Sequence, residues 1–203
     1  MWPRVASALA VLAVVAGGCG SAPSPDPAAV AAMPGGHHAS MSAMPGMSGM
    51  DMSSATGAGS GPSQTASMIC GHEIRAAVQH TLELSRPPQP VHSWAHRLYT
   101  CIYRLADGGQ LSLSVKDLDT PRPGRAYFDR LRATTPGAKS IVGLPAFGFP
   151  AFESAHGDVV FLKDHKTLYV DATRLNAADL PTDVNRQVAA YGVAAAVIAC
   201  WTE

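Results

Sequence analysis

Side chains that bind soft metal ions are concentrated in one short part of the sequence. Of eight methionines, all except Met1 lie between residues 33 and 68. Two adjacent histidines precede a run in which thioethers recur every two or three residues, so that the candidate ligands are His37, His38, Met41, Met44, Met47, Met50 and Met52. Thioethers favour Cu(I), and imidazoles bind both Cu(I) and Cu(II). The spacing therefore predicts copper binding.

The segment that carries these ligands is expected to be disordered. From Gly20 to about Ser67 it consists almost entirely of Gly, Ala, Ser, Pro and Met, with no Lys or Arg. Such a composition buries too little apolar surface to offset the entropy of ordering. Methionine normally fills gaps in cores, so packing does not explain its concentration here. Ordering each residue around an ion costs about 1 to 2 kcal/mol, which favours transient copper binding over a required cofactor.

About twenty residues of this segment resemble the Met-rich, His-containing stretches of periplasmic copper-resistance proteins and of the extracellular tails of copper transporters. The resemblance implies a role in copper buffering or sensing. Two alternatives stay open: a low-complexity linker that gained methionine through GC-rich codon usage, and a scavenger of oxidants, since exposed methionine is readily oxidised. The scavenger would not need His37 and His38.

The first nineteen residues predict export and a lipid anchor. Arg4 precedes a largely apolar run from Val5 to Ala16, which is shorter than the roughly 20 residues that a membrane span needs and is typical of a signal peptide over residues 1–18. Ala16-Gly-Gly-Cys19 resembles the lipobox of bacterial lipoproteins, which implies diacylation of Cys19 and anchoring at the extracytoplasmic face of the cell membrane. The usual Leu is replaced by Ala16, so cleavage by an ordinary signal peptidase stays open. A tether over residues 19–67 would reach about 35 to 40 Å.

Residues 68–203 have the length of one folded domain. This part holds fourteen Lys or Arg and thirteen Asp or Glu. The balance predicts no contact with nucleic acid and no basic footprint for acidic lipid.

The histidines of this domain form no recognisable metal or catalytic pattern. His72-Glu73 begins like a zinc-protease helix, but Ala76 occupies the place of the second histidine. His92 and His96 are four residues apart, and the preceding prolines favour a loop there. A Gly-x-Ser-x-Gly elbow, a phosphate-binding glycine loop and a Cys-x-x-Cys pair are all missing. We therefore expect no enzymatic activity.

The most unusual stretch of the domain is the apolar loop from Leu144 to Phe152. It places Phe147, Phe149 and Phe152 within six positions between two prolines. These rings are candidates for a groove that binds a ligand or a partner. The alternative is that they close one end of the core.

Hydrophobic periodicity predicts the elements that must position this loop. Helices are expected over His72–Leu84, Gly124–Thr134 and Asp183 to about Cys200. A hairpin is expected over Arg97–Leu105 and Gln110–Lys116, and three more strands over Ser140–Val142, Val159–Lys163 and Thr167–Asp171. Together they predict a single α+β domain, in which two or three helices pack against one face of an antiparallel sheet of about five strands.

The order of elements resembles a broad group of uncharacterised actinobacterial surface lipoproteins with a PsbP-like α+β domain. The resemblance is carried by Cys70 before a helix, Cys101-Ile-Tyr103 in the next strand, the segment from Ile141 to Ala146, and the closing helix. The usual Gly-Asp pair is replaced by Leu144-Pro145. Three pairings are open among Cys70, Cys101 and Cys200 in an oxidising compartment. The resemblance implies the pair Cys70–Cys101, which leaves Cys200 as a buried structural thiol.

These features predict a non-enzymatic lipoprotein of the cell envelope. Its tether would bind copper weakly, and its domain would bind an envelope protein or a small apolar ligand. The alternative is a ligand-binding or scaffold lipoprotein with no metal role.

Overall fold

The structure is a computed structural model that describes residues 61–201. The predicted signal peptide, the lipidation site Cys19 and the proposed copper ligands all lie outside the described residues. Between residues 61 and 201, no helix is long and apolar enough to cross a membrane.

The centre of the domain is one antiparallel sheet of seven strands, in the order β1-β2-β3-β7-β6-β5-β4. The strands are β1 Pro90–Ala95, β2 Leu98–Arg104, β3 Gln110–Lys116, β4 Lys139–Ile141, β5 Ala151–Glu153, β6 Asp158–Lys163 and β7 Lys166–Asp171. The α+β class is confirmed, with seven strands where about five were expected. On β3, Leu111, Leu113 and Val115 are fully buried while the residues between them are half-buried, as the alternation of the sequence predicted.

The two strands that the sequence analysis missed are β1 and β5. The prolines of residues 86–90 precede β1 rather than interrupt it, and Pro90 is its first residue, at the edge of the sheet, where a missing N–H costs no ladder bond. The loop expected around His92 is therefore wrong. Strand β5 has three residues and directly follows Pro150, which is too short for an alternating pattern.

Four α-helices accompany the sheet in this part of the chain: α1 Gln64–Ser67, α2 His72–Thr81, α3 Pro121–Thr134 and α4 Arg186–Cys200. Helix α3 begins three residues earlier than expected because proline suits the first turn of a helix, where its missing N–H has no partner to lose. Helix α4 begins three residues later than expected, since the Asn185 side chain accepts the N–H of Val188 at 2.9 Å and caps the helix there.

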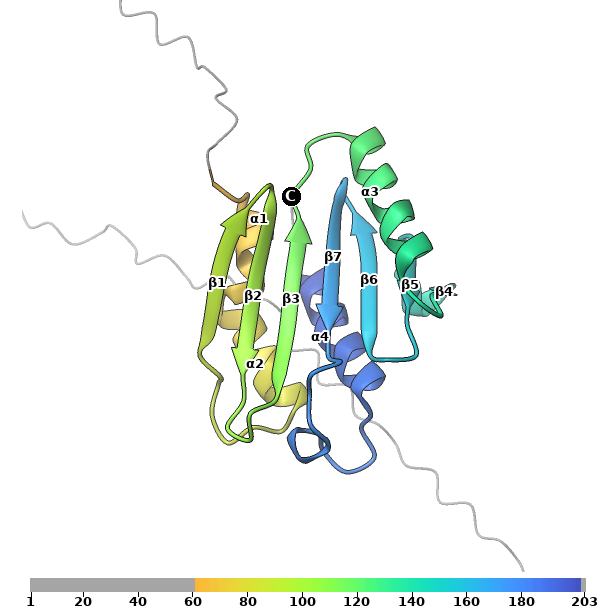
Figure 1. Cartoon of the computed structure of the whole chain (residues 1–203). Coiled ribbons are helices and arrows are strands. Elements are labelled where there is room, and N and C mark those ends of the chain that lie inside the picture. Colours follow the sequence, from red (N-terminus) through yellow and green to blue (C-terminus); the bar gives the residue numbers. More distant parts are fainter. Residues whose placement is uncertain (1–60, 202–203) are drawn as a thin grey trace, which may run out of the picture. The chain divides into compact units, whose positions relative to one another are not determined.

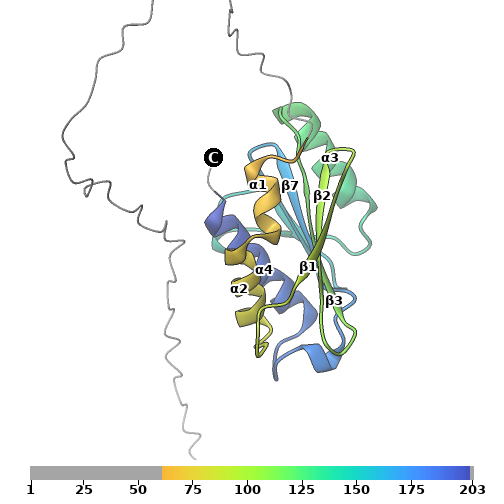
Figure 2. The same ribbon diagram turned by 90° about the vertical axis from the view of Figure 1, so that its left-hand side faces the viewer.

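The helices lie on both faces of the sheet, whereas one face was expected. Helices α1, α2 and α4 cover one face, and α3 lies on the other, as Figures 1 and 2 show. On the α3 side, Phe128 meets Phe152 edge-on with 5.3 Å between ring centroids, and both pack with Val160. This small second core holds α3 on the β5–β6–β7 half of the sheet.

The folded domain begins before Met68. Thr65 and Ala66 of α1 are buried, so the residues up to Ser67 that were assigned to the tether belong in part to the domain. Met68 lies in a short 3-10 helix, Met68–Cys70, and packs against the core. Packing therefore does explain this one methionine.

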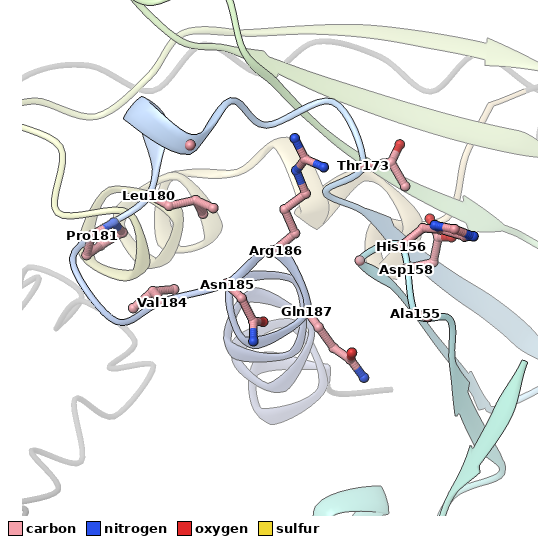
Figure 3. Close-up of a pocket in the computed structure, with 12 residues that line it drawn as sticks. Ala155, His156, Asp158, Thr173, Leu180, Pro181, Val184, Asn185, Arg186 and Gln187 are labelled. Atoms are coloured by element: carbon pink, nitrogen blue, oxygen red, sulfur yellow. The ribbon is translucent and has the colours of Figure 1, made fainter. Parts of the chain in front are cut away.

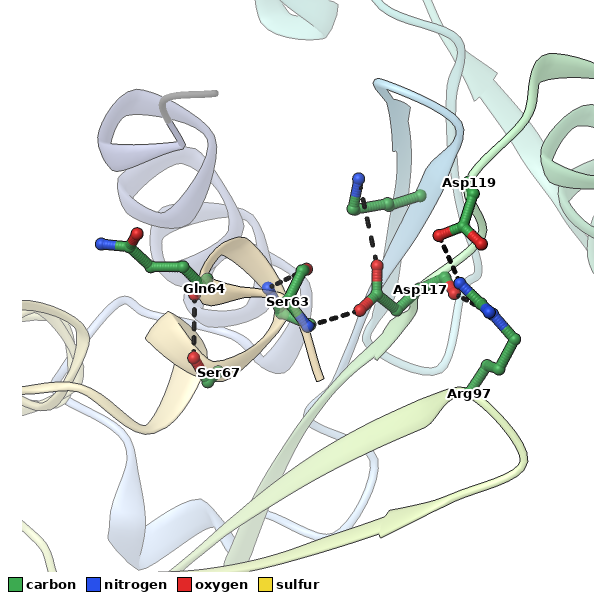
Figure 4. A network of polar contacts seen from close by, with 8 residues as sticks. Ser63, Gln64, Ser67, Arg97, Asp117 and Asp119 are labelled. Atoms are coloured by element: carbon green, nitrogen blue, oxygen red, sulfur yellow. Dashed lines mark hydrogen bonds and ion pairs between the residues drawn. The ribbon is translucent and has the colours of Figure 1, made fainter. Parts of the chain in front are cut away.

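A buried carboxylate joins this first segment to the sheet (Figure 4). The N–H of Ser63 donates to Oδ2 of Asp117 at 2.7 Å, and Lys166 Nζ lies 3.9 Å from the other carboxylate oxygen. Arg97 donates to the Asp117 carbonyl at 2.7 Å and pairs with Asp119. Asp117 thus sets the point at which the N-terminal segment leaves the domain.

The disulfide Cys70–Cys101 is confirmed, with 5.6 Å between the Cα atoms. It links the end of the 3-10 helix to β2, and the Tyr103 hydroxyl donates to the Ile69 carbonyl at 2.6 Å beside it. Cys200 packs half-buried against the core, and none of the described cysteines is a free thiol. The expectation of an unpaired thiol at Cys200 is therefore wrong.

Replacement of Asp117 by Ala should loosen α1 locally. The Ser63 N–H would lose a charged acceptor, which costs about 1.5 to 3 kcal/mol. We expect faster amide exchange over residues 64–67, while the central strands keep their protection. The Asp117→Asn variant retains an oxygen acceptor, so its amide exchange rates over residues 64–67 should lie between those of the parent chain and those of the Asp117→Ala variant. Unchanged exchange in α1 of the Asp117→Ala variant would contradict this account.

Replacement of Gly124 by Ala should destabilise the docking of α3. A Cβ at this position would lie 2.2 Å from the His165 carbonyl oxygen, so backbones must move apart. Helix propensity alone would make Ala more stable by about 1 kcal/mol. We expect instead a loss of about 1 to 3 kcal/mol in the free energy of unfolding, measured by denaturant titration. The control is Ala126→Gly on the exposed side of α3, where propensity alone should cost about 1 kcal/mol; a stabilised Gly124→Ala variant would show that the contact is not tight.

Candidate functional site

One candidate site is a groove between α3 and the connection from β4 to β5. It has a volume of about 1020 Å³. One wall is Arg125, Phe128 and Arg132 of α3, and the other comes from residues 140–144 and 146–151. The predicted apolar loop therefore faces α3 across the groove, while its Ala146, Phe149 and Ala151 pack against the main core.

The three phenylalanines that were predicted to line the groove have different roles. Phe152 is fully buried beneath α3, so for this ring the alternative interpretation, closure of a core, is correct. Phe149 is half-buried, and Lys163 Nζ lies 5.4 Å from its ring centroid. Phe147 is 45% exposed at the groove and makes a tilted contact with Phe161. Two of the three rings, Phe147 and Phe149, line the groove.

Two further apolar residues at the groove were not singled out from the sequence. Leu144 is 93% exposed and Val142 is 74% exposed, and both line the groove beside Phe147. Val142 was expected inside a strand, but β4 ends at Ile141. The glycines at positions 143 and 148, which flank this part of the loop, were the available signal, because they indicate turns that lift side chains off the sheet.

The loop holds these apolar side chains in a defined position. Its short 3-10 helix, η2 Leu144–Ala146, buries Ala146. The Tyr191 hydroxyl of α4 donates to the Pro145 carbonyl at 2.9 Å. Phe147 has a left-handed backbone with φ of 52°, a conformation that costs of order 1 to 3 kcal/mol outside glycine. Surrounding contacts must maintain this conformation, which directs the Phe147 ring to the groove.

Positive charge is concentrated along the same edge of the domain. Between residues 121 and 140 the only acid is Asp129, and the bases, all exposed, are Arg122, Arg125, Arg130, Arg132 and Lys139. Arg125 pairs with Asp129 at 2.9 Å. The helical repeat places Arg122, Arg125 and Arg132 on one stripe of α3, beside the groove. The near-zero charge of the whole domain therefore conceals a local excess of positive charge.

A second hollow of about 860 Å³ lies between the β5–β6 turn and the start of α4 (Figure 3). His156 and Asp158 face it from the turn, and Asn185, Arg186 and Gln187 face it from α4. Leu180, Pro181 and Val184 supply its apolar part.

The Asp158 carboxylate at the second hollow is hydrogen-bonded to neighbouring side chains. Ser154 Oγ donates to Asp158 at 2.6 Å and accepts the backbone N–H of His156 at 3.2 Å. The Tyr169 hydroxyl donates to the other oxygen of Asp158 at 2.8 Å. Burial, followed by this hydrogen bond to the carboxylate, raises the pKa of Tyr169. Ser154 is buried and points at a carboxylate rather than an imidazole, so this cluster lacks a nucleophile–base pair.

The described histidines do not converge on a metal site. His92 lies on β1 and stacks with Tyr99 at 5.7 Å between ring centroids. His96 lies in the turn after β1, with φ of 51°. Across residues 61–201, no group of three or more His, Cys, Asp or Glu side chains could hold a metal ion.

Comparison with known proteins identifies no relative of this chain. No protein-family model, curated protein or solved structure matches the chain. The resemblance to PsbP-like lipoproteins stays a prediction, and the function has to be inferred from the groove and from the tether sequence.

Proposed function

We propose that this chain is a non-enzymatic lipoprotein of the cell envelope, whose domain binds a partner or a small apolar ligand in the groove between α3 and the β4–β5 loop. The observation that carries the proposal is the exposure of Val142, Leu144 and Phe147 side by side on a loop held by hydrogen bonds. Water contact with apolar surface costs about 25 cal/mol per Å². A cluster of this kind is typical of an interaction site.

Core packing does not account for this cluster. Phe152 and Ala146 of the same loop are buried, so the fold already obtains its packing contacts from neighbouring positions. Leu144, by contrast, is almost fully exposed, and a polar residue there would leave the core unchanged. An apolar side chain at this position contributes free energy only when something else covers it.

The tether supplies the second part of the proposal. Its Met and His residues would bind copper weakly and reversibly at the membrane surface, to which diacylated Cys19 would attach the chain. Copper would be a transient ligand rather than a cofactor. The alternative proposal is a ligand-binding or scaffold lipoprotein without a metal role. It would use the same groove, but its tether would not bind copper.

Titration of Cu(I) against a peptide of residues 33–52 separates these two proposals. We expect weak binding that falls about tenfold or more when Met44, Met47 and Met50 are replaced by Leu, because three thioether ligands are lost. Leucine keeps the size and hydrophobicity of methionine, so loss of affinity reports on sulfur alone. Equal affinity of the two peptides, or no binding by either, would remove copper from the account.

Binding of the uncharged dye Nile red tests the groove. We expect the double variant Leu144→Ser, Phe147→Ser to bind it about tenfold more weakly, since the two side chains, which the dye covers in part, would together contribute about 1.4 kcal/mol. The matched control is Val91→Ser, Val188→Ser, which removes two side chains of 51% and 53% exposure from β1 and α4. Equal loss in both double variants would show that the dye does not report on the groove.

A further inference from the structure

We infer that the face formed by α3 and the β4–β5 loop docks the domain onto a membrane surface that contains anionic phospholipid. This inference rests on the proposed function and identifies the partner of the same groove. This face consists of the exposed side chains of Arg122, Arg125, Arg132, Val142, Leu144 and Phe147.

The apolar residues of this face are exposed in a way that suits an interface better than a pocket. A small molecule is usually bound with most of its surface enclosed by walls. Leu144 and Val142 are 93% and 74% exposed, so they stand at the outer rim, where a ligand within the groove would leave much of their surface in water. Insertion into the boundary between headgroups and acyl chains would cover them.

The charges of this face complement anionic headgroups. Arg125 and Arg132 line the groove directly, and Arg122 lies on the same stripe of α3 one turn earlier. Arginine binds phosphate through a planar fork of donors. Helix α3 carries four arginines and Asp129, a net charge of +3 (4 − 1), and three of these arginines lie on the stripe beside the apolar tip. A cluster of four or more bases beside inserting apolar residues is the composition that anionic lipid attracts.

The proposed anchor also makes the membrane the surface within reach. The proposed tether, which ends before α1, has an expected end-to-end distance of about 30 to 40 Å, which allows the domain to return to the bilayer that holds Cys19. A soluble acidic protein could satisfy the same charges, but the tether would not raise its local concentration in this way.

Vesicle binding by the full chain tests the inference. The chain carries Cys19→Ser, so that no acyl group contributes to binding. It is sedimented with vesicles of phosphatidylcholine alone and with vesicles of equal parts phosphatidylcholine and phosphatidylglycerol. We expect binding to the anionic vesicles, weakened by salt because salt screens exposed charges, and much weaker binding to the neutral ones.

Two pairs of variants separate the apolar from the charged contribution. Val142→Ser, Leu144→Ser and, separately, Arg122→Gln, Arg132→Gln should each weaken binding to anionic vesicles by about tenfold. The controls Val91→Ser, Val188→Ser and Arg86→Gln, Arg104→Gln alter exposed positions elsewhere and should bind as the parent chain does. Thermal unfolding of every variant checks that the fold is intact.

The outcomes also separate this inference from the proposed function. No binding to anionic vesicles, equal binding to both kinds, or equal loss in the control variants would overturn membrane docking. If vesicles do not bind while Nile red still depends on Leu144 and Phe147, the groove serves a soluble partner, and only the membrane inference fails. Loss of both signals overturns both.

Discussion

The candidate site depends on one close approach between two backbones. Gly124 in the first turn of α3 lies so near the β6–β7 turn that a Cβ would be 2.2 Å from the His165 carbonyl oxygen. This contact lets α3 lie directly on the sheet, where Phe128 reaches Phe152 and Val160. Since Arg125 and Arg132 are on the same helix, the docking of α3 also creates one wall of the groove. Without it, the groove would lack its α3 wall, and Arg125 and Arg132 would not lie beside the apolar loop.

The opposite wall shows that the fold maintains a costly arrangement at this edge. Phe147 holds a left-handed backbone, and Leu144 leaves its side chain almost wholly in water. Both features lower stability, and the hydrogen bond from Tyr191 to Pro145 helps to keep them in place. The second hollow differs, because its buried carboxylate is satisfied by Ser154 and Tyr169. One region therefore contributes internal stability, and the other leaves apolar surface in water.

Strands with a half-buried face were predicted from the sequence, whereas β1, at one edge of the sheet, and the three-residue β5 were not. Strand β3 alternates Leu111, Leu113 and Val115 with polar residues, because one side faces the core and the other faces water. Strand β1 has only a weak pattern, since it lies at the edge behind a run of prolines. Helix α1 has four residues, too few to be stable alone. It is held by the bond from Ser63 to Asp117, 54 residues away, a contact that local periodicity cannot reveal.

The α+β class, the apolar loop at residues 144–152 and the concentration of methionine and histidine in a segment poor in core-forming residues could all be read from the residues alone. These features depend on composition and on local periodicity, which need no knowledge of distant contacts. The burial of Phe152 and the exposure of Phe147 and Leu144, by contrast, follow from the packing of the folded domain. The tertiary structure also decided that α3 lies on the opposite face from the other helices, with its arginines beside the loop. Burial is set by residues remote in the chain, and a balanced sum of charges contains no information about where each charge lies.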